Sequence, residues 1–266
     1  MKILFSTGSL YYLPVREVFL LAAEAGFDGC DLVIDGRFNQ PGYVENVKAC
    51  LDILPVYSVH APYATIKAWK NHKEALRQSV GIARALGAEV VNFHPPSWFS
   101  FEISFFRWFN KVHDFQKEFG AKSLNLTLEN MPLIGKRLML APYVLNDYRD
   151  LIDFGINRNL CFTFDTTHIA SYGNDPIAAF IQYFKTGRLK NIHLSDCRGF
   201  KSHLFLGKGD LPLAKLLNTM RRLGYDGMVT LEISPDELPK TREWLVKMMG
   251  YQFAFIELHW RKDSNV

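Results

Sequence analysis

Short runs of apolar and β-branched residues alternate along the chain with longer stretches in which apolar residues recur every three or four positions. The short runs predict β-strands and the longer stretches predict amphipathic helices. Helices are clearest at 14–27, 72–88 and 211–227, because the apolar periodicity of each one stops at a glycine. The predicted strands lie near residues 2–6, 29–34, 56–60, 89–94, 124–129, 160–165, 190–195 and 228–233.

This alternation predicts an α/β protein, and a series of units of about 30 residues each is typical of a (β/α)8 TIM barrel. The 266 residues contain no low-complexity stretch and no linker rich in proline, glycine and serine. We therefore expect a single domain spanning residues 1–266. The aromatic segment 98–109 fits either a further helix or a loop over the mouth of the barrel, and the helix is favoured.

Six of the predicted strands end in a histidine, a glutamate or an aspartate. In a TIM barrel the C-terminal ends of the strands form the active face, so such side chains converge. Imidazole and carboxylate together are the ligands of zinc, manganese and similar divalent ions. One such histidine alone is usually an ordinary core residue, but the recurrence predicts a shared metal site. The six residues are His60, His94, Glu129, Asp165, His193 and Glu232.

Two further histidines extend this set. His168 follows Asp165 by three residues in the sequence DTTH, and His203 lies in the stretch after the seventh predicted strand. Asp165 would also serve simply as the N-cap of a following helix. The remaining histidines with a clear context fall within helical patterns and are interpreted as ordinary. They are His72, His113 and His259.

Charge and composition exclude few classes of protein. The formal net charge of +4 permits an anionic ligand but is too weak to indicate nucleic acid. No run approaches the ~20 apolar residues of a membrane span, and the N-terminus lacks the pattern of a signal peptide. Basic residues after the fifth and seventh strands fit either solvated loops or a phosphate site, which glycine N–H groups would assist. These residues are Lys136, Arg137, Arg198, Lys201 and Lys208, with Gly207 and Gly209.

The cysteines predict the cellular compartment rather than the chemistry. Because they are widely spaced and form no CxxC pair, we expect reduced thiols in a cytoplasmic protein. Cys197 lies near the predicted site, and we interpret it as a bystander rather than a ligand. The four cysteines are Cys30, Cys50, Cys161 and Cys197.

Seven motifs together resemble a known family. With them the chain is similar, over nearly its whole length, to the xylose-isomerase-like TIM-barrel superfamily, which includes sugar isomerases, sugar epimerases and endonuclease IV. No single motif is decisive, but their order and their positions on the strands are specific. They are HAPY (60–63), HPP (94–96), LEN (128–130), FDTTH (164–168), HLSD (193–196), LGKGD (206–210) and GYDGMVTLE (224–232).

The isomerase and epimerase branch implies one divalent ion, Mn, Co, Mg or Zn, held by Glu129, Asp165, His193 and Glu232. The resemblance implies that the two glutamates are also catalytic. They would move protons on opposite faces of a sugar or sugar phosphate through a metal-stabilised cis-enediolate. The resemblance and the basic loop together give the candidate substrate-binding residues, which are His168, Arg198, Lys201, Lys208 and Tyr63.

The endonuclease IV branch implies three zinc ions. His60 and His94 would hold a first ion, which Glu129 would bridge to the second. The third ion needs His168, His203 and an aspartate where this chain has Lys201, so that two ions or three would be bound. Tyr63 matches a family position near DNA, but Ala64 follows where a larger apolar residue is expected.

Lys201 and Ala64 thus differ from the endonuclease IV branch at positions that its catalytic site uses. The preferred prediction is therefore a metal-dependent isomerase or epimerase. The alternative is a zinc phosphodiesterase that acts on abasic-site DNA. A barrel that binds metal or sugar without catalysis is a second alternative. The aromatic stretches 98–109 and 251–260 would pack on the barrel or on a second copy of the chain, which leaves homo-oligomerisation open.

Overall fold

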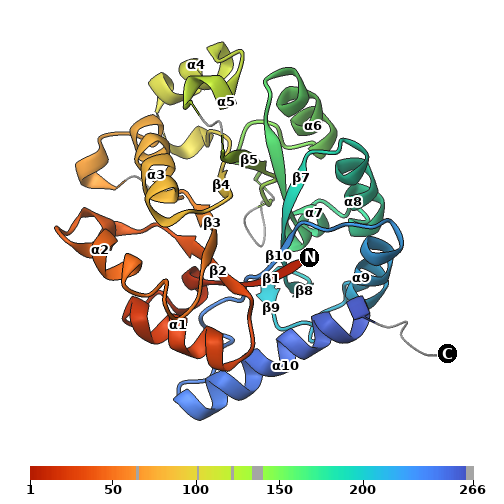
Figure 1. Cartoon of the computed structure of the whole chain (residues 1–266). Coiled ribbons are helices and arrows are strands. Elements are labelled where there is room, and N and C mark those ends of the chain that lie inside the picture. Colours follow the sequence, from red (N-terminus) through yellow and green to blue (C-terminus); the bar gives the residue numbers. More distant parts are fainter. Residues whose placement is uncertain (64–65, 101, 121–122, 134–139, 262–266) are drawn as a thin grey trace.

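The computed structural model describes residues 1–63, 66–100, 102–120, 123–133 and 140–261. Eight parallel strands close into a barrel in the order β1-β10-β7-β6-β5-β4-β3-β2, with helices around it (Figure 1). The expected (β/α)8 TIM barrel is therefore confirmed. The barrel strands are β1 (Lys2–Ser6), β2 (Gly29–Val33), β3 (Val56–His60), β4 (Val90–Phe93), β5 (Asn125–Glu129), β6 (Cys161–Asp165), β7 (Leu189–Leu194) and β10 (Met228–Leu231).

The helices cover the outside of the barrel, and the last of them, α10, packs against α9 and α1 and so closes the ring (Figure 1). None of the helices described is both long enough and apolar enough to cross a membrane. The helices are α1 (Val15–Glu24), α2 (Tyr43–Lys48), α3 (His72–Leu86), α4 (Ile103–Lys111), α5 (Phe115–Glu118), α6 (Tyr148–Asn157), α7 (Thr166–Ser171), α8 (Pro176–Lys185), α9 (Leu213–Arg222) and α10 (Arg242–Arg261).

Two local features differ from the expectation. A small antiparallel hairpin of β8 (Asp196–Arg198) and β9 (Lys201–Leu204) follows β7 outside the barrel sheet. The segment 98–109 is helical only in its second half. Phe105 and Phe109, four residues apart, are buried on α4, whereas Trp98 and Phe99 are 55% and 52% exposed in a short 3-10 turn. The helix α4 therefore buries Phe105 and Phe109 on one face, although its first residue, Ile103, is 64% exposed.

The sequence glycine–aromatic–Asp–Gly precedes both β2 and β10, and the structure explains both glycines. Gly26 and Gly224, which follow α1 and α9, have φ of 96° and 74°, a left-handed conformation that favours glycine. At the second glycine of each motif, neighbouring atoms leave no room for a side chain. A Cβ on Gly29 would lie 2.9 Å from the Pro55 carbonyl, and one on Gly227 would lie 2.8 Å from the Lys190 carbonyl.

The interior of the barrel is layered. At the bottom, Leu4, Val90 and Met228 form a buried apolar cluster against Tyr57, separate from the large core between strands and helices. Two residues further along each strand, on the same inward face, the side chains are polar. All eight are at most 1% exposed: Ser6, Asp31, Ser58, Asn92, Thr127, Thr163, Asn191 and Thr230.

Candidate metal centre

Four side chains meet at the C-terminal mouth of the barrel. Glu129 ends β5, Asp165 ends β6, His193 lies on β7 and Glu232 directly follows β10. Their ligand atoms all lie within 4.8 Å of one another. These strands are consecutive around the barrel, so the fold brings together residues that are far apart in the sequence.

Four atoms of this group are buried without a hydrogen-bond partner in the structure: Asp165 Oδ2, both ring nitrogens of His193 and Glu232 Oε2. His193 Nδ1 lies 2.8 Å from Glu232 Oε2 and 3.4 Å from Glu129 Oε1. Buried polar atoms without partners are unfavourable. Nitrogen and oxygen donors that converge in this way are what a divalent cation requires. The residues present therefore fit a bound divalent metal ion.

In this group, the positive charge of protonated histidine offsets the negative charges of the carboxylates. Burial alone would raise the pKa of Glu129, but neighbouring histidines, His193 first, lower it well below its usual value. Burial also opposes the shift at His193, whose pKa the charges of Glu129 and Glu232 raise well above its usual value. Without a metal, protonated imidazole therefore supplies the positive charge that the carboxylates need.

His60 and His94 form a second group with Glu129, again with ligand atoms within 4.8 Å. Their Nε2 atoms lie 3.3 Å and 3.4 Å from Glu129 Oε2 and 3.2 Å from each other. His60 Nδ1 donates to the Ala61 carbonyl at 2.7 Å, so Nε2 faces the group. Burial lowers the pKa of His94. At His60 burial is outweighed by Glu129, which raises the pKa to about 9.

Asp165, His168 and His203 form a third group. Asp165 caps α7 as expected, and the oxygen that would act as a ligand is not the one that caps. Its Oδ1 caps α7 by accepting from His168 N at 2.8 Å and from Thr167 Oγ1 at 2.9 Å, while Oδ2 stays available to the cluster. His203 adopts a left-handed backbone with φ of 55°, and its Nδ1 lies 3.2 Å from Ser195 Oγ.

Asn130, which follows Glu129, joins β5 to β6. Its amide group donates to the Asp165 carbonyl and accepts from Asp165 N, both at 3.0 Å. Its own carbonyl accepts from His168 Nδ1 at 2.8 Å. Asn130 therefore orients two candidate ligands. In the sequence, only the position of Asn130 at the end of the motif LEN distinguishes it, and that position does not predict this role.

Asp196 holds together the loop after β7. Its carboxylate accepts from the backbone N–H groups of Cys197, Gly207, Gly209 and Leu211 at 2.8–3.0 Å. The expectation that the two glycine N–H groups cradle an anion is therefore wrong, because Asp196 already uses them. A Cβ on Gly209 would lie 2.3 Å from Asp196 Oδ1, so the carboxylate explains this glycine.

The basic residues of this loop lie on its surface. Arg198 pairs with Asp210 at 3.2 Å, and Lys208 pairs with Glu237. Lys201 is exposed on β9. Two of these three cations are therefore neutralised by acidic partners. Three positions named above lie outside the described residues: Ala64, Lys136 and Arg137.

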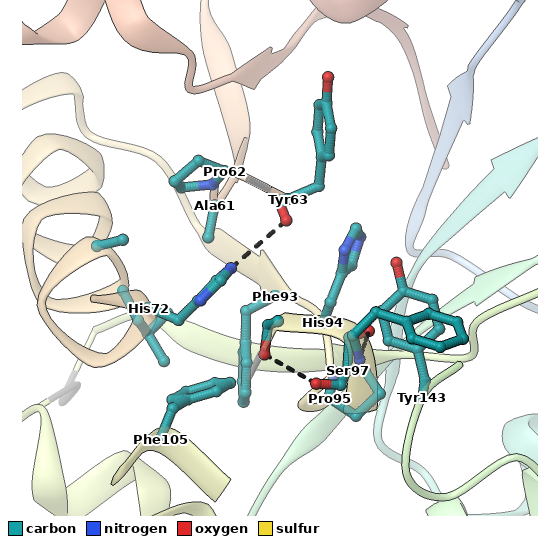
Figure 2. A pocket seen from close by; sticks show the side chains of 14 residues that line it. Ala61, Pro62, Tyr63, His72, Phe93, His94, Pro95, Ser97, Phe105 and Tyr143 are labelled. Carbon is teal, nitrogen blue, oxygen red and sulfur yellow. Dashed lines mark hydrogen bonds between the residues drawn. The ribbon is translucent and has the colours of Figure 1, made fainter. Parts of the chain in front are cut away.

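A cavity of about 300 Å³ adjoins the second group, on the side facing α3 (Figure 2). His94 and His72 lie on different sides of this cavity, and His72 pairs with Glu102 at 2.9 Å. Tyr63 is 74% exposed at its rim. The cavity offers aromatic faces and few charges. Apart from the histidines, its lining includes Ala61, Pro62, Tyr63, Phe93, Phe105 and Tyr143.

Backbone hydrogen bonds fix the wall of this cavity. Trp98 N donates to the Pro142 carbonyl at 2.7 Å, and Val144 N donates to the Pro96 carbonyl at 2.9 Å. These two bonds join the loops after β4 and β5. His72, which the sequence pattern marked as ordinary, lines the cavity.

Cys197 shows no sign of reactivity. Burial, and then the charges of Asp196 and other nearby carboxylates, raise the pKa of its thiol to about 11. A protonated thiol is a poor ligand and a poor nucleophile. The four cysteines are all free.

Comparison with known proteins agrees with this fold. The family model described as xylose isomerase-like TIM barrel matches residues 19–248. An uncharacterized protein of Methanocaldococcus jannaschii is 27% identical over 253 residues, covering 86% of this chain and 83% of that protein. D-psicose 3-epimerase of Clostridium cellulolyticum H10, solved with D-tagatose, has a TM-score of 0.74 at 15% identity over 98% of this chain and 99% of that one. The IOLI protein, solved with a zinc atom, has a TM-score of 0.75 at 14% identity over 98% of this chain and 100% of that one.

Proposed function

Because the chain belongs to the xylose isomerase-like TIM barrel family, we propose that it is a divalent-metal-dependent isomerase or epimerase of sugars. One observation carries the proposal. Glu129, Asp165, His193 and Glu232 place ligand atoms within 4.8 Å of one another, and three of these residues hold a buried atom without a hydrogen-bond partner. One imidazole and three carboxylates suit Mn, Co, Mg or Zn.

When bound, the ion supplies a Lewis acid that polarises the substrate carbonyl and acidifies the neighbouring C–H bond. One of the two glutamates, Glu129 and Glu232, removes that proton from one face of the substrate, and the other donates its own proton to the same carbon from the opposite face. The two glutamates differ in how far solvent reaches their side chains. The Glu232 side chain is 28% exposed and can exchange its proton with solvent, whereas that of Glu129 is 1% exposed and is held by the Asn92 amide.

A neutral sugar suits the mouth of the barrel better than a sugar phosphate. Arg198 and Lys208, two of the candidate phosphate-binding cations, are neutralised by Asp210 and Glu237. The aromatic cavity beside His94 offers apolar faces to a carbon chain or ring.

The four free cysteines support a reducing compartment such as the cytoplasm.

The test is proton exchange in heavy water. Protein loaded with Mn²⁺ or Co²⁺ is incubated with D-tagatose, D-allulose or D-fructose, and mass spectrometry detects deuterium at the carbon next to the carbonyl. We expect incorporation with at least one sugar and none with Glu232→Gln. A protein that binds no divalent metal and exchanges no proton in any sugar of the panel would contradict the proposal.

A zinc phosphodiesterase remains a second candidate, because two further groups of possible ligands surround the first. The groups around His60 and around His203 each bring three side chains within ligand distance. Measuring zinc per chain, together with incision of a duplex carrying an abasic analogue, separates the candidates. Two or three tightly held ions with metal-dependent incision would favour the phosphodiesterase.

Lys201→Asp sharpens this comparison. Lys201 is exposed on β9, two residues before His203. A carboxylate there would add a charged ligand to the third group, so we expect this variant to bind about one more ion per chain. Arg198→Asp, on the paired strand, is the matched control. Equal metal content in Lys201→Asp and the unmodified protein would show that Lys201 does not limit this group.

A further inference from the structure

His193 differs from three other candidate ligand histidines in one respect. In each of those three, a ring nitrogen is already occupied by a neighbour: His60 by the Ala61 carbonyl, His168 by the Asn130 carbonyl and His203 by the Ser195 hydroxyl. In His193, Nδ1 faces the two glutamates, and Nε2 is fully buried without a partner in the structure. A histidine that binds a metal through one nitrogen almost always donates the other N–H to a carboxylate, a carbonyl or a water.

Asp31 is a fully buried carboxylate that also lacks a partner. It lies on β2 in the polar layer below the mouth, and neither of its oxygens accepts a hydrogen bond in the structure. Its neighbours in register are Ser6 on β1 and Ser58 on β3, whose hydroxyls are likewise buried and unpartnered. A buried carboxylate without a donor is strongly unfavourable, which suggests that it serves a neighbouring group.

The fold places Asp31 one layer below the level at which the ring of His193 stacks on that of His60. The imidazole of His193 reaches from β7 to stack on His60 of β3, with ring centroids 5.6 Å apart and planes at 27°. On β2, Val33 is in register with His60, so Asp31 is one inward position below that level. Electrostatics agrees with this placement. Burial raises the pKa of Asp31, and the strongest opposing influence comes from His193, followed by His60.

We propose that Asp31 is a positioning residue that accepts the Nε2–H of His193, directly or through one buried water shared with Ser6 and Ser58. The carboxylate fixes the tautomer in which Nδ1 is the ligand atom, and it makes the imidazole a stronger donor to the ion. The inference rests on the proposed metal-dependent function. Asp31 itself touches neither the substrate nor the ion.

The tautomer of His193 tests the contact directly. In protein labelled with ¹⁵N-histidine, we expect the Nε2–H signal of His193 to be observable and protected from exchange with water, both with and without zinc. In Asp31→Asn, an isosteric change, that signal should shift or exchange at least tenfold faster, while the signal of His168 stays in place. An unchanged His193 signal would overturn the inference, and the metal-free measurement decides this even if no metal binds.

Metal affinity provides the second measurement. Competition with a chromophoric chelator should show Asp31→Asn binding Zn²⁺ roughly 10–100-fold more weakly than the unmodified protein. Thr230→Val removes a hydrogen bond to Asn191 from the same buried layer and should leave the affinity within about twofold. If Asp31 were purely structural, Asp31→Asn would lower the thermal midpoint while leaving the zinc affinity of the folded protein and the His193 signal unchanged, and that result would overturn the inference.

The outcomes separate this inference from the proposed function. If the unmodified protein bound no divalent metal, the proposed function would fail, while the NMR measurement would still test the contact. If it bound metal normally and Asp31→Asn changed neither the affinity nor the His193 signal, only the role of Asp31 would be rejected.

Discussion

Glu129 is the residue that connects the first two candidate ligand groups. Four imidazoles, those of His60, His94, His168 and His193, have a nitrogen within 3.3–3.4 Å of its carboxylate. It belongs to two of the three groups. A carboxylate that is 1% exposed keeps its charge in such a place only because cations or hydrogen-bond donors surround it.

Replacing this carboxylate tests its two proposed roles together. In Glu129→Gln an amide that carries two donor hydrogens would face nitrogens that need an acceptor or an ion. We expect weaker metal binding and a loss of turnover of about 10²–10⁴-fold or more, because ligand and proton carrier are both removed. Glu232→Gln should lose similar turnover. Activity within about tenfold of normal in either variant, measured by deuterium exchange with circular dichroism as the control for folding, would reject the proton-transfer role.

His60 predicts how metal binding depends on pH. Its pKa is raised to about 9, so at neutral pH the metal-free protein carries a proton there, and this positive charge beside Glu129 opposes the binding of a cation. We expect metal affinity to fall as the pH is lowered from about 9 to 6.5 and binding to release protons. Calorimetry in buffers of different ionisation enthalpy measures that release, and His60→Asn should reduce it. A release independent of His60 would contradict the assignment.

The imidazole of His60 also makes the stability of the metal-free protein depend on pH, and its raised pKa determines the direction of that dependence. A histidine whose pKa is higher in the folded state stabilises the fold fully below its unfolded value of about 6.5, and this contribution disappears as the pH rises through about 9. The metal-free protein should therefore lose this part of its stability between these limits, and His60→Asn should flatten the change in thermal midpoint.

Sequence reasoning identified the candidate ligands but not the residues that orient them. His60, Asp165 and His193 were predictable because residue type and position at a strand end suffice to place a side chain at the mouth of a barrel. Asn130 and Asp31 were not, since their roles depend on which atom faces which neighbour. One signal was available in the sequence. A polar residue precedes each of the six strand-end candidates by two positions, as in NFH and TLE, which marks an inward-facing polar layer.

At the scale of elements, Asp196 determines the shape of the β8–β9 hairpin and of the turn that follows it. Four backbone N–H groups donate to its carboxylate. Removing it leaves these donors without their acceptor and loosens the segment that carries His203. The loop that sequence reasoning interpreted as a basic, anion-binding segment is thus organised around an internal anion.

We expect Asp196→Ala to lower the free energy of unfolding by about 2–4 kcal/mol, since hydrogen bonds to a charged group are lost and buried donors are left unpaired. Urea denaturation measures this change, and hydrogen exchange should show residues 196–211 losing protection first. Asp210→Asn, which removes an exposed ion pair with Arg198, is the control and should change stability by less than about 1 kcal/mol. Equal effects of the two variants would contradict the role of Asp196.

Why the hairpin escaped prediction is clear from its residues. The sequence DCRGFKSHL has no long β-branched run, and its strands are only three and four residues long. Three of the four anchoring contacts join Asp196 to residues 11 to 15 positions later, beyond the range of local patterns. The pairs Arg198–Asp210 and Lys208–Glu237, which neutralise two expected substrate-binding cations, are likewise tertiary contacts.

At the scale of the whole molecule, the barrel was predictable because its signal is distributed over many units. Each predicted strand overlaps an observed barrel strand, and errors of one or two residues at the ends do not alter the ring. The segment 98–109 was less predictable. Its aromatic residues are divided between the cavity, the core and solvent, and their spacing alone does not reveal which of these each one faces.

Metal removal should be visible in the stability of the whole chain. If the carboxylates and imidazoles at the mouth bind an ion in the folded state alone, a free ion at 100 times its dissociation constant adds about 2.7 kcal/mol to the free energy of unfolding. We therefore expect a chelator to lower the thermal midpoint and Mn²⁺, Co²⁺ or Zn²⁺ to restore it. Asp165→Asn should reduce the gain, because one ligand loses its charge. A midpoint indifferent to both chelator and metal would contradict a structural link between ion and fold.

The apolar cluster of Leu4, Val90 and Met228 at the bottom of the barrel has a consequence for kinetics. Together with the fully buried polar layer above it, this cluster closes the barrel at the N-terminal ends of the strands, so a reactant can enter and leave only at the opposite end. Substrate and product then occupy the same site in turn. An enzyme built in this way should show product inhibition that is competitive with substrate.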